Sequence, residues 1–87
     1  MKLVVVGRDN TDYARELSMW IGDFEHETGK KVELLDPDTV EGEMFIRARD
    51  ILEFPAVVAI DDDGRVLKKW TGRKFPRIND VSYYSQP

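Results

Sequence analysis

A short, uniformly apolar segment near the N-terminus restricts the fold more than any other feature of this sequence. Leu3–Val6 reads LVVV and is followed by Gly7. A β-branched run without polar alternation is typical of a strand buried on both faces, as in a parallel sheet covered by helices. We therefore expect helices on both sides of this strand.

The next segment has the pattern of an amphipathic helix. Residues 8–12 (RDNTD) are of the types that cap helices, because a short side-chain oxygen can accept hydrogen bonds from the first turn. Apolar residues then recur at intervals of three and four as far as Thr28-Gly29, where glycine permits the left-handed conformation that ends many helices. The apolar face consists of Tyr13, Leu17, Trp20, Ile21 and Phe24.

A second strand and a second helix are predicted to follow. Lys31–Leu35 completes a βαβ unit, whose two strands should run parallel. Asp38 and Glu41 have the spacing of a capping box and predict the start of the helix, although Gly42 should weaken it. The predicted buried face consists of Val40, Met44, Ala48, Ile51 and Leu52.

The rest of the chain has the pattern of a hairpin followed by a short helix. Residues 56–60 and 65–70 are β-rich and flank Asp61-Asp62-Asp63-Gly64, whose Asp-Gly pair suits a tight turn. Pro76 is well placed to open a last helix that runs to Tyr83 or Tyr84. The acidic turn does not match a calcium loop of the EF-hand type, because Ala59 and Trp70 would hold its first and last ligand positions.

Composition sets limits on function. The 87 residues suffice for a single domain, residues 1–87, and contain no cysteine. Disulfides, thiolate metal ligands and thiol catalysis are therefore excluded. There is no apolar run of transmembrane length and no signal-like N-terminus, so we expect a cytoplasmic protein without membrane contact.

The order β-α-β-α-β-β, with a short last helix, resembles the thioredoxin-like fold in its minimal, glutaredoxin-sized form. Thr11-Asp12-Tyr13-Ala14 falls where that family carries C-x-x-C, with the tyrosine of the glutaredoxin C-P-Y-C in register and both cysteines replaced. Glu53-Phe54-Pro55-Ala56-Val57 resembles the segment with the family's cis-proline, which makes Pro55 the candidate. The segment DDDGRVLKKWTG, ending at Gly72, resembles its fourth strand and following glycine. The resemblance implies an α/β/α sandwich with a four-stranded mixed sheet.

The same resemblance suggests a binding groove without redox chemistry. Beside the cis-proline, proteins of this fold offer backbone N–H and C=O groups to an extended peptide or to glutathione. Here Thr11, Tyr13, Phe54 and Pro55 would line that groove. Because Thr11 has no sulfur and His26 is distant along the helix, no catalytic residue is predicted. The favoured interpretation of Thr11-Asp12-Tyr13-Ala14 is a simple helix start with Tyr13 as a packing residue, and a retained binding role is the alternative.

A second candidate surface is basic. Residues 1–64 contain 7 basic and 16 acidic residues, a balance of −9, whereas residues 65–87 have a balance of +5. The candidate contact residues are Lys68, Lys69, Arg73, Lys74 and Arg77. Basic and aromatic residues alternate there as on nucleic-acid surfaces, but the acidic remainder would repel a polyanion, and edge-strand lysines also prevent aggregation.

The predicted function is therefore a non-catalytic thioredoxin-like domain that binds a protein or acts as an adaptor, with no cofactor and no metal. One alternative is a domain that binds glutathione or another thiol and assists a separate catalytic chain. Another is partner binding of the kind found in clock proteins of this fold, although the DDDG hairpin favours the ordinary thioredoxin-like strand pair. Nucleic acid is the less favoured partner.

Overall fold

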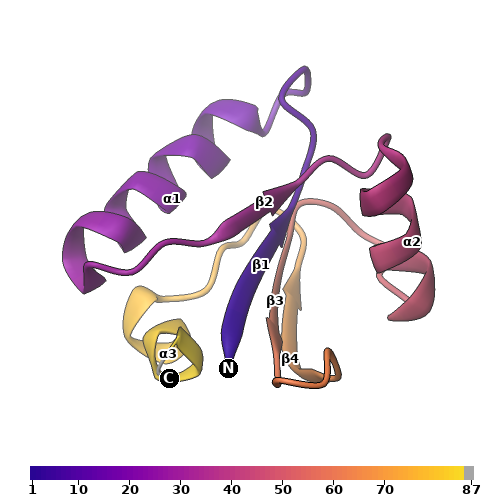
Figure 1. Ribbon diagram of the computed structural model, residues 1–87. Helices are drawn as coiled ribbons and strands as arrows, with labels where there is room; N and C mark the ends of the chain where they lie inside the picture. Colours follow the sequence, from indigo (N-terminus) through magenta and orange to yellow (C-terminus); the bar gives the residue numbers. More distant parts are fainter. Residues whose placement is uncertain (86–87) are drawn as a thin grey trace.

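The computed structural model describes residues 1–85 and forms three layers, with α1 and α3 on one face of a central sheet and α2 on the other (Figure 1). In chain order the elements are β1 (Lys2–Val6), α1 (Ala14–Thr28), β2 (Glu33–Leu35), α2 (Val40–Ala48), β3 (Ala56–Ile60), β4 (Val66–Thr71), α3 (Ile78–Ser82) and the 3-10 helix η1 (Tyr83–Ser85). Among these residues no helix is long and apolar enough to cross a membrane.

The sheet has the order β2-β1-β3-β4, which places β1 in the interior and β2 and β4 at the edges. β1 and β2 run parallel, with Val5 opposite Leu34, whereas β1–β3 and β3–β4 are antiparallel. The predicted mixed four-stranded α/β sheet is confirmed. Three boundaries differ: the second strand begins at Glu33 rather than Lys31, the fourth covers Val66–Thr71, and the last helix begins at Ile78 rather than Pro76.

Alternate residues of β1 and β3 face opposite sides of the sheet and therefore contribute to two hydrophobic cores. Leu3 and Val5 pack with Leu17, Trp20 and Phe24 of α1 and with other residues of that side. On the α2 side the core consists of Val4, Val6, Leu35, Ile51, Ala56, Val58 and Ile60. Both faces of β1 are therefore covered, as the run LVVV predicts.

Helix α1 ends as predicted but begins differently. Gly29 adopts a left-handed conformation with φ of 70° after the last turn. At the other end Tyr13 is the N-cap residue and no side chain caps the helix. The prediction that the polar stretch RDNTD caps α1 was therefore wrong, because the Thr11 hydroxyl donates instead to the carbonyl of Arg8 at 3.2 Å.

Helix α2 differs most from the prediction. The cap is Thr39 rather than Asp38, since the Thr39 hydroxyl accepts from the N–H of Gly42 at 3.0 Å. The helix ends at Ala48, before the predicted Ile51 and Leu52. Four members of the predicted buried face are exposed, namely Val40 (79%), Met44 (67%), Leu52 (86%) and Ala48. Phe45 and Ile46 instead pack against the core, together with the buried Ile51.

Candidate functional site

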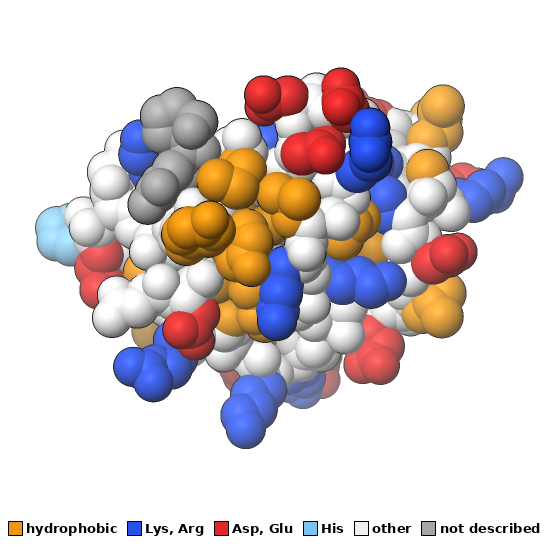
Figure 2. All heavy atoms as spheres, turned by 90° about the horizontal axis from the view of Figure 1, so that it is seen from below, with side chains coloured by type: hydrophobic (Ala, Val, Ile, Leu, Met, Phe, Trp, Pro, Cys, Tyr) orange, Lys and Arg blue, Asp and Glu red, His pale blue; other side chains and the backbone are white. Residues whose placement is uncertain are grey.

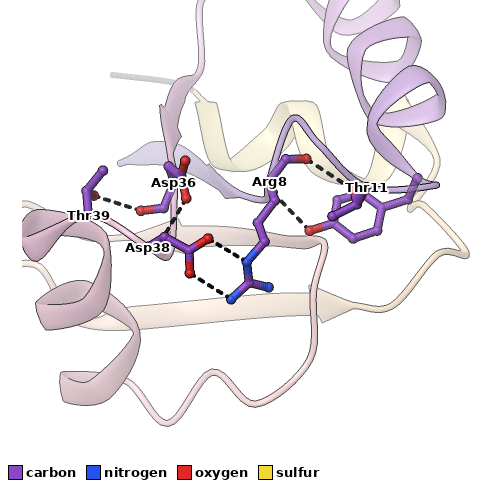
Figure 3. A network of polar contacts seen from close by, with 6 residues as sticks. Arg8, Thr11, Asp36, Asp38 and Thr39 are labelled. Atoms are coloured by element: carbon purple, nitrogen blue, oxygen red, sulfur yellow. Dashed lines mark hydrogen bonds and ion pairs between the residues drawn. The ribbon is translucent and has the colours of Figure 1, made fainter.

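Arg8, in the loop between β1 and α1, connects most of the predicted groove (Figure 3). Its backbone N–H donates to the hydroxyl of Tyr13 at 2.9 Å, and its backbone carbonyl accepts from the hydroxyl of Thr11. Its guanidinium carbon lies 5.3 Å from the centre of the Phe54 ring, within the range of a cation–π contact. One residue therefore contacts three of the four predicted groove residues.

Arg8 is itself fixed by an acidic residue from a distant part of the chain. Its Nε and one terminal nitrogen donate to the two oxygens of Asp38, at 2.9 and 3.1 Å, in a bidentate pair. This hydrogen bond raises the pKa of Arg8 and lowers the pKa of Asp38. Both groups therefore stay charged at neutral pH, and the pair joins the β1–α1 loop to the start of α2.

Tyr13 contributes to the interior rather than to an open surface. Its side chain is only 7% exposed, and its hydroxyl already has the Arg8 N–H as a partner. A Cβ added to Gly7 would lie 3.3 Å from the Tyr13 ring and 3.7 Å from Pro55, so both residues flank Gly7 closely. Tyr13 and Pro55 are thus brought together, while Thr11 and Phe54 remain half-buried.

The backbone around Pro55 includes polar groups that have no hydrogen-bond partner among the described residues. The Phe54–Pro55 peptide bond is cis, and the Pro55 carbonyl accepts from the N–H of Gly72 at 2.9 Å. Within residues 1–85, neither the N–H nor the C=O of Phe54 has a hydrogen-bond partner. Glu53 is exposed, and its carboxylate lies near Gly72, since a Cβ added to Gly72 would be 3.6 Å from it.

The predicted basic residues differ in their contacts. Arg73 forms ion pairs with Asp12 at 3.0 Å and Glu16 at 3.2 Å, and Lys69 donates to the carbonyl of Asp50 at 3.0 Å. For Lys68, Lys74 and Arg77 no ion pair is found among the described residues. Figure 2 shows basic and acidic side chains interspersed around an apolar cluster on the lower face of the molecule.

The predicted groove contains no cysteine. The Thr11 hydroxyl is bonded to a carbonyl, and His26 lies in the last turn of α1, at the opposite end of the helix. In the part of the chain that the structure describes, no cluster of His, Asp and Glu has the arrangement of a metal site. The pairing of Arg8 with Asp38 was not predicted from the sequence, because 30 residues separate them and Asp38 was interpreted there only as part of a capping box.

Comparison with known proteins gives a structural match. No model of a known protein family and no curated protein sequence matches the chain. Thioredoxin 1 from the thermophilic eubacterium Thermosipho africanus TCF52B is similar in structure, with a TM-score of 0.66 over 97% of this chain and 89% of that chain. The two sequences are 15% identical, so the likeness shows the fold. The chain therefore has the thioredoxin-like fold, in a form without cysteine.

Proposed function

We propose that this protein is a non-catalytic thioredoxin-like domain that binds an extended segment of a protein partner in the groove beside Pro55. The observation that carries this proposal is the unpaired N–H and C=O of Phe54. One residue that presents both groups can pair with one residue of an extended peptide, as in strand addition. Neither hydrogen bond requires a cysteine.

The surroundings of Phe54 support a binding role. Arg8 lies against the Phe54 ring and is held by Asp38, so the ring is supported before a ligand arrives. A preorganised surface loses less conformational entropy when it binds. Because the Phe54 ring is half-buried, it also provides apolar area for a neighbouring side chain of the peptide.

An amide-to-ester replacement at Phe54 tests this proposal, since it removes the N–H and leaves the side chain in place. Peptides are first selected from a random display library on the wild-type protein, and their affinities are then measured by calorimetry. We expect the Phe54 ester to weaken binding about tenfold, the loss of roughly one hydrogen bond. In an amide NMR titration with the same peptide, the Phe54 resonance should shift strongly.

The matched control is the same replacement at Asp62. The Asp62 N–H lies in the β3–β4 turn and has no partner within residues 1–85, so its loss should leave peptide affinity unchanged. Equal affinity of the Phe54 ester and the wild type would contradict the proposal. Glutathione, titrated separately, distinguishes the alternative: shifts at Phe54 with glutathione, and none with any selected peptide, would favour a thiol-binding domain.

A further inference from the structure

The two edges of the sheet differ in their protection against pairing with another strand. β4 contains Lys68 and Lys69, and its pairing with β3 is irregular between Ala59 and Ile60. Lysines and bulges both hinder the addition of a further strand. β2 has no lysine within its bounds, and its central residue, Leu34, is 57% exposed.

The backbone of Leu34 has unused hydrogen-bonding groups at this edge. The carbonyl of Leu35 faces β1, since it accepts from the N–H of Gly7 at 3.1 Å. Successive residues of a strand direct their backbone groups to opposite edges, so those of Leu34 point away from β1. Among the described residues, neither the N–H nor the C=O of Leu34 has a partner.

An apolar hollow lies next to this edge and can accept side chains from a neighbour. It has a volume of about 260 Å³, and Leu34 lines it together with Ala14, Leu17 and Ile21 of α1. The exposed Leu34 and the hollow lie on the same side of the sheet. A strand added at β2 would therefore gain both backbone hydrogen bonds and apolar contact.

The charges that flank β2 indicate which strand could pair with its free edge. Lys30 and Lys31 precede β2, whereas Asp36 and Asp38 follow it. Lys31 pairs with Glu25 at 3.5 Å and Asp38 pairs with Arg8, so Lys30 and Asp36 are the flanking charges without an ion pair among the described residues. If two copies of this segment run antiparallel, each basic end lies beside the acidic end of the other copy. The segment is therefore complementary in charge to itself, which is the condition for an isologous two-fold contact.

We propose that two copies of this chain associate through their β2 edges, antiparallel, with the two-fold axis at Leu34. The Leu34 residues then exchange two N–H to C=O hydrogen bonds, and the two sheets become one. The pairing is short, because the Val32 N–H is held by Glu25 at 3.3 Å and the Asp36 carbonyl by the Thr39 N–H at 3.1 Å. The dimer is therefore weak and depends on concentration.

Sedimentation velocity from micromolar to millimolar protein tests this inference. The wild type should shift toward twice the monomer mass as concentration rises, and added salt should weaken the association. Leu34→Lys places a charge at the centre of the contact and should raise the dissociation constant at least about tenfold. Leu52→Lys is the matched control, because Leu52 is 86% exposed in the loop after α2, and it should associate like the wild type.

Two results would overturn the inference. One is a wild type that remains monomeric at millimolar concentration. The other is a dimer that Leu34→Lys and Leu52→Lys weaken equally, since the contact would then lie elsewhere, for example at β4. Neither result bears on the Phe54 groove, whose peptide binding is measured separately on the same variants.

Discussion

At the scale of single residues, Asp61 makes the β3–β4 turn dependent on pH. One of its carboxylate oxygens accepts from the N–H groups of Asp63 and Arg65, both at 2.9 Å. The hydrogen bond from Arg65 is the main cause that lowers the pKa of Asp61. Because the folded pKa lies below the unfolded value of about 3.9, this contribution to stability is present above that value and is lost as pH falls through the folded pKa.

Asp61→Asn keeps an acceptor oxygen but removes the ionisable group. We expect the wild type to exceed Asp61→Asn in free energy of unfolding at neutral pH, and the difference to shrink as pH falls below about 4. Urea denaturation at a series of pH values measures this difference in the free energy of unfolding. Asp62→Asn is the control, because Asp62 accepts no hydrogen bond from the turn backbone. The assignment fails if both variants differ from the wild type by an amount independent of pH.

At the scale of elements, replacement of glycine by alanine should have opposite effects on stability in α1 and in α2. A Cβ added to Gly42 would lie 1.9 Å from the carbonyl oxygen of Asp36, a backbone atom that cannot rotate away. Gly22 is exposed on α1, and a Cβ there would meet nothing within 4 Å. Gly42→Ala should therefore destabilise by at least about 2 kcal/mol, from overpacking, whereas Gly22→Ala should stabilise by roughly 0.5–1 kcal/mol.

Chemical denaturation, followed by circular dichroism, measures both changes. Gly22→Ala serves as the control for Gly42→Ala, because it replaces a helical glycine by alanine where the added Cβ meets no neighbour within 4 Å. If Gly42→Ala also stabilises the protein, then α2 does not approach the Asp36 carbonyl closely enough to exclude a Cβ.

Gly42 also explains why the sequence predicts some elements better than others. The strands and α1 could be predicted because apolar runs, periodicity and glycine-containing turns are local signals. The face of α2 could not, because its closest contact is made by a glycine, which has no hydrophobic signal. In addition, Ile51 continues the helical spacing but follows Asp50, whose φ of 54° is outside the helical range.

The candidate site was likewise predictable only in part. The groove segments followed from the likeness to a known fold, and Tyr13 and Pro55 do flank Gly7. The pairing of Arg8 with Asp38 and of Arg73 with Asp12 depends on tertiary structure, which brings together residues 30 and 61 positions apart. No local pattern in the sequence indicates such pairs.

At the scale of the whole molecule, Trp20 joins α1 to the C-terminal segment. Its indole N–H donates to the carbonyl of Pro76, 56 positions away, at 2.9 Å. Its ring stacks on Phe75, with the ring centres 6.2 Å apart, and on Phe24 at 5.6 Å. Because α3 begins two residues after Pro76, this contact helps to hold α3 against the face of the sheet that α1 also covers.

Trp20→Phe preserves an aromatic ring but removes the donor, which leaves the Pro76 carbonyl without a partner. We expect a loss of about 1–3 kcal/mol in the free energy of unfolding. Amide hydrogen exchange should also accelerate in α3 more than in β1 and β3, because local opening releases the C-terminal segment first. Trp70→Phe is the control. Trp70 has an edge contact with Tyr84, and its indole N–H has no hydrogen-bond partner within residues 1–85. Uniform acceleration across the sheet and α3 in Trp20→Phe would show that the hydrogen bond stabilises the whole fold and not the docking of α3.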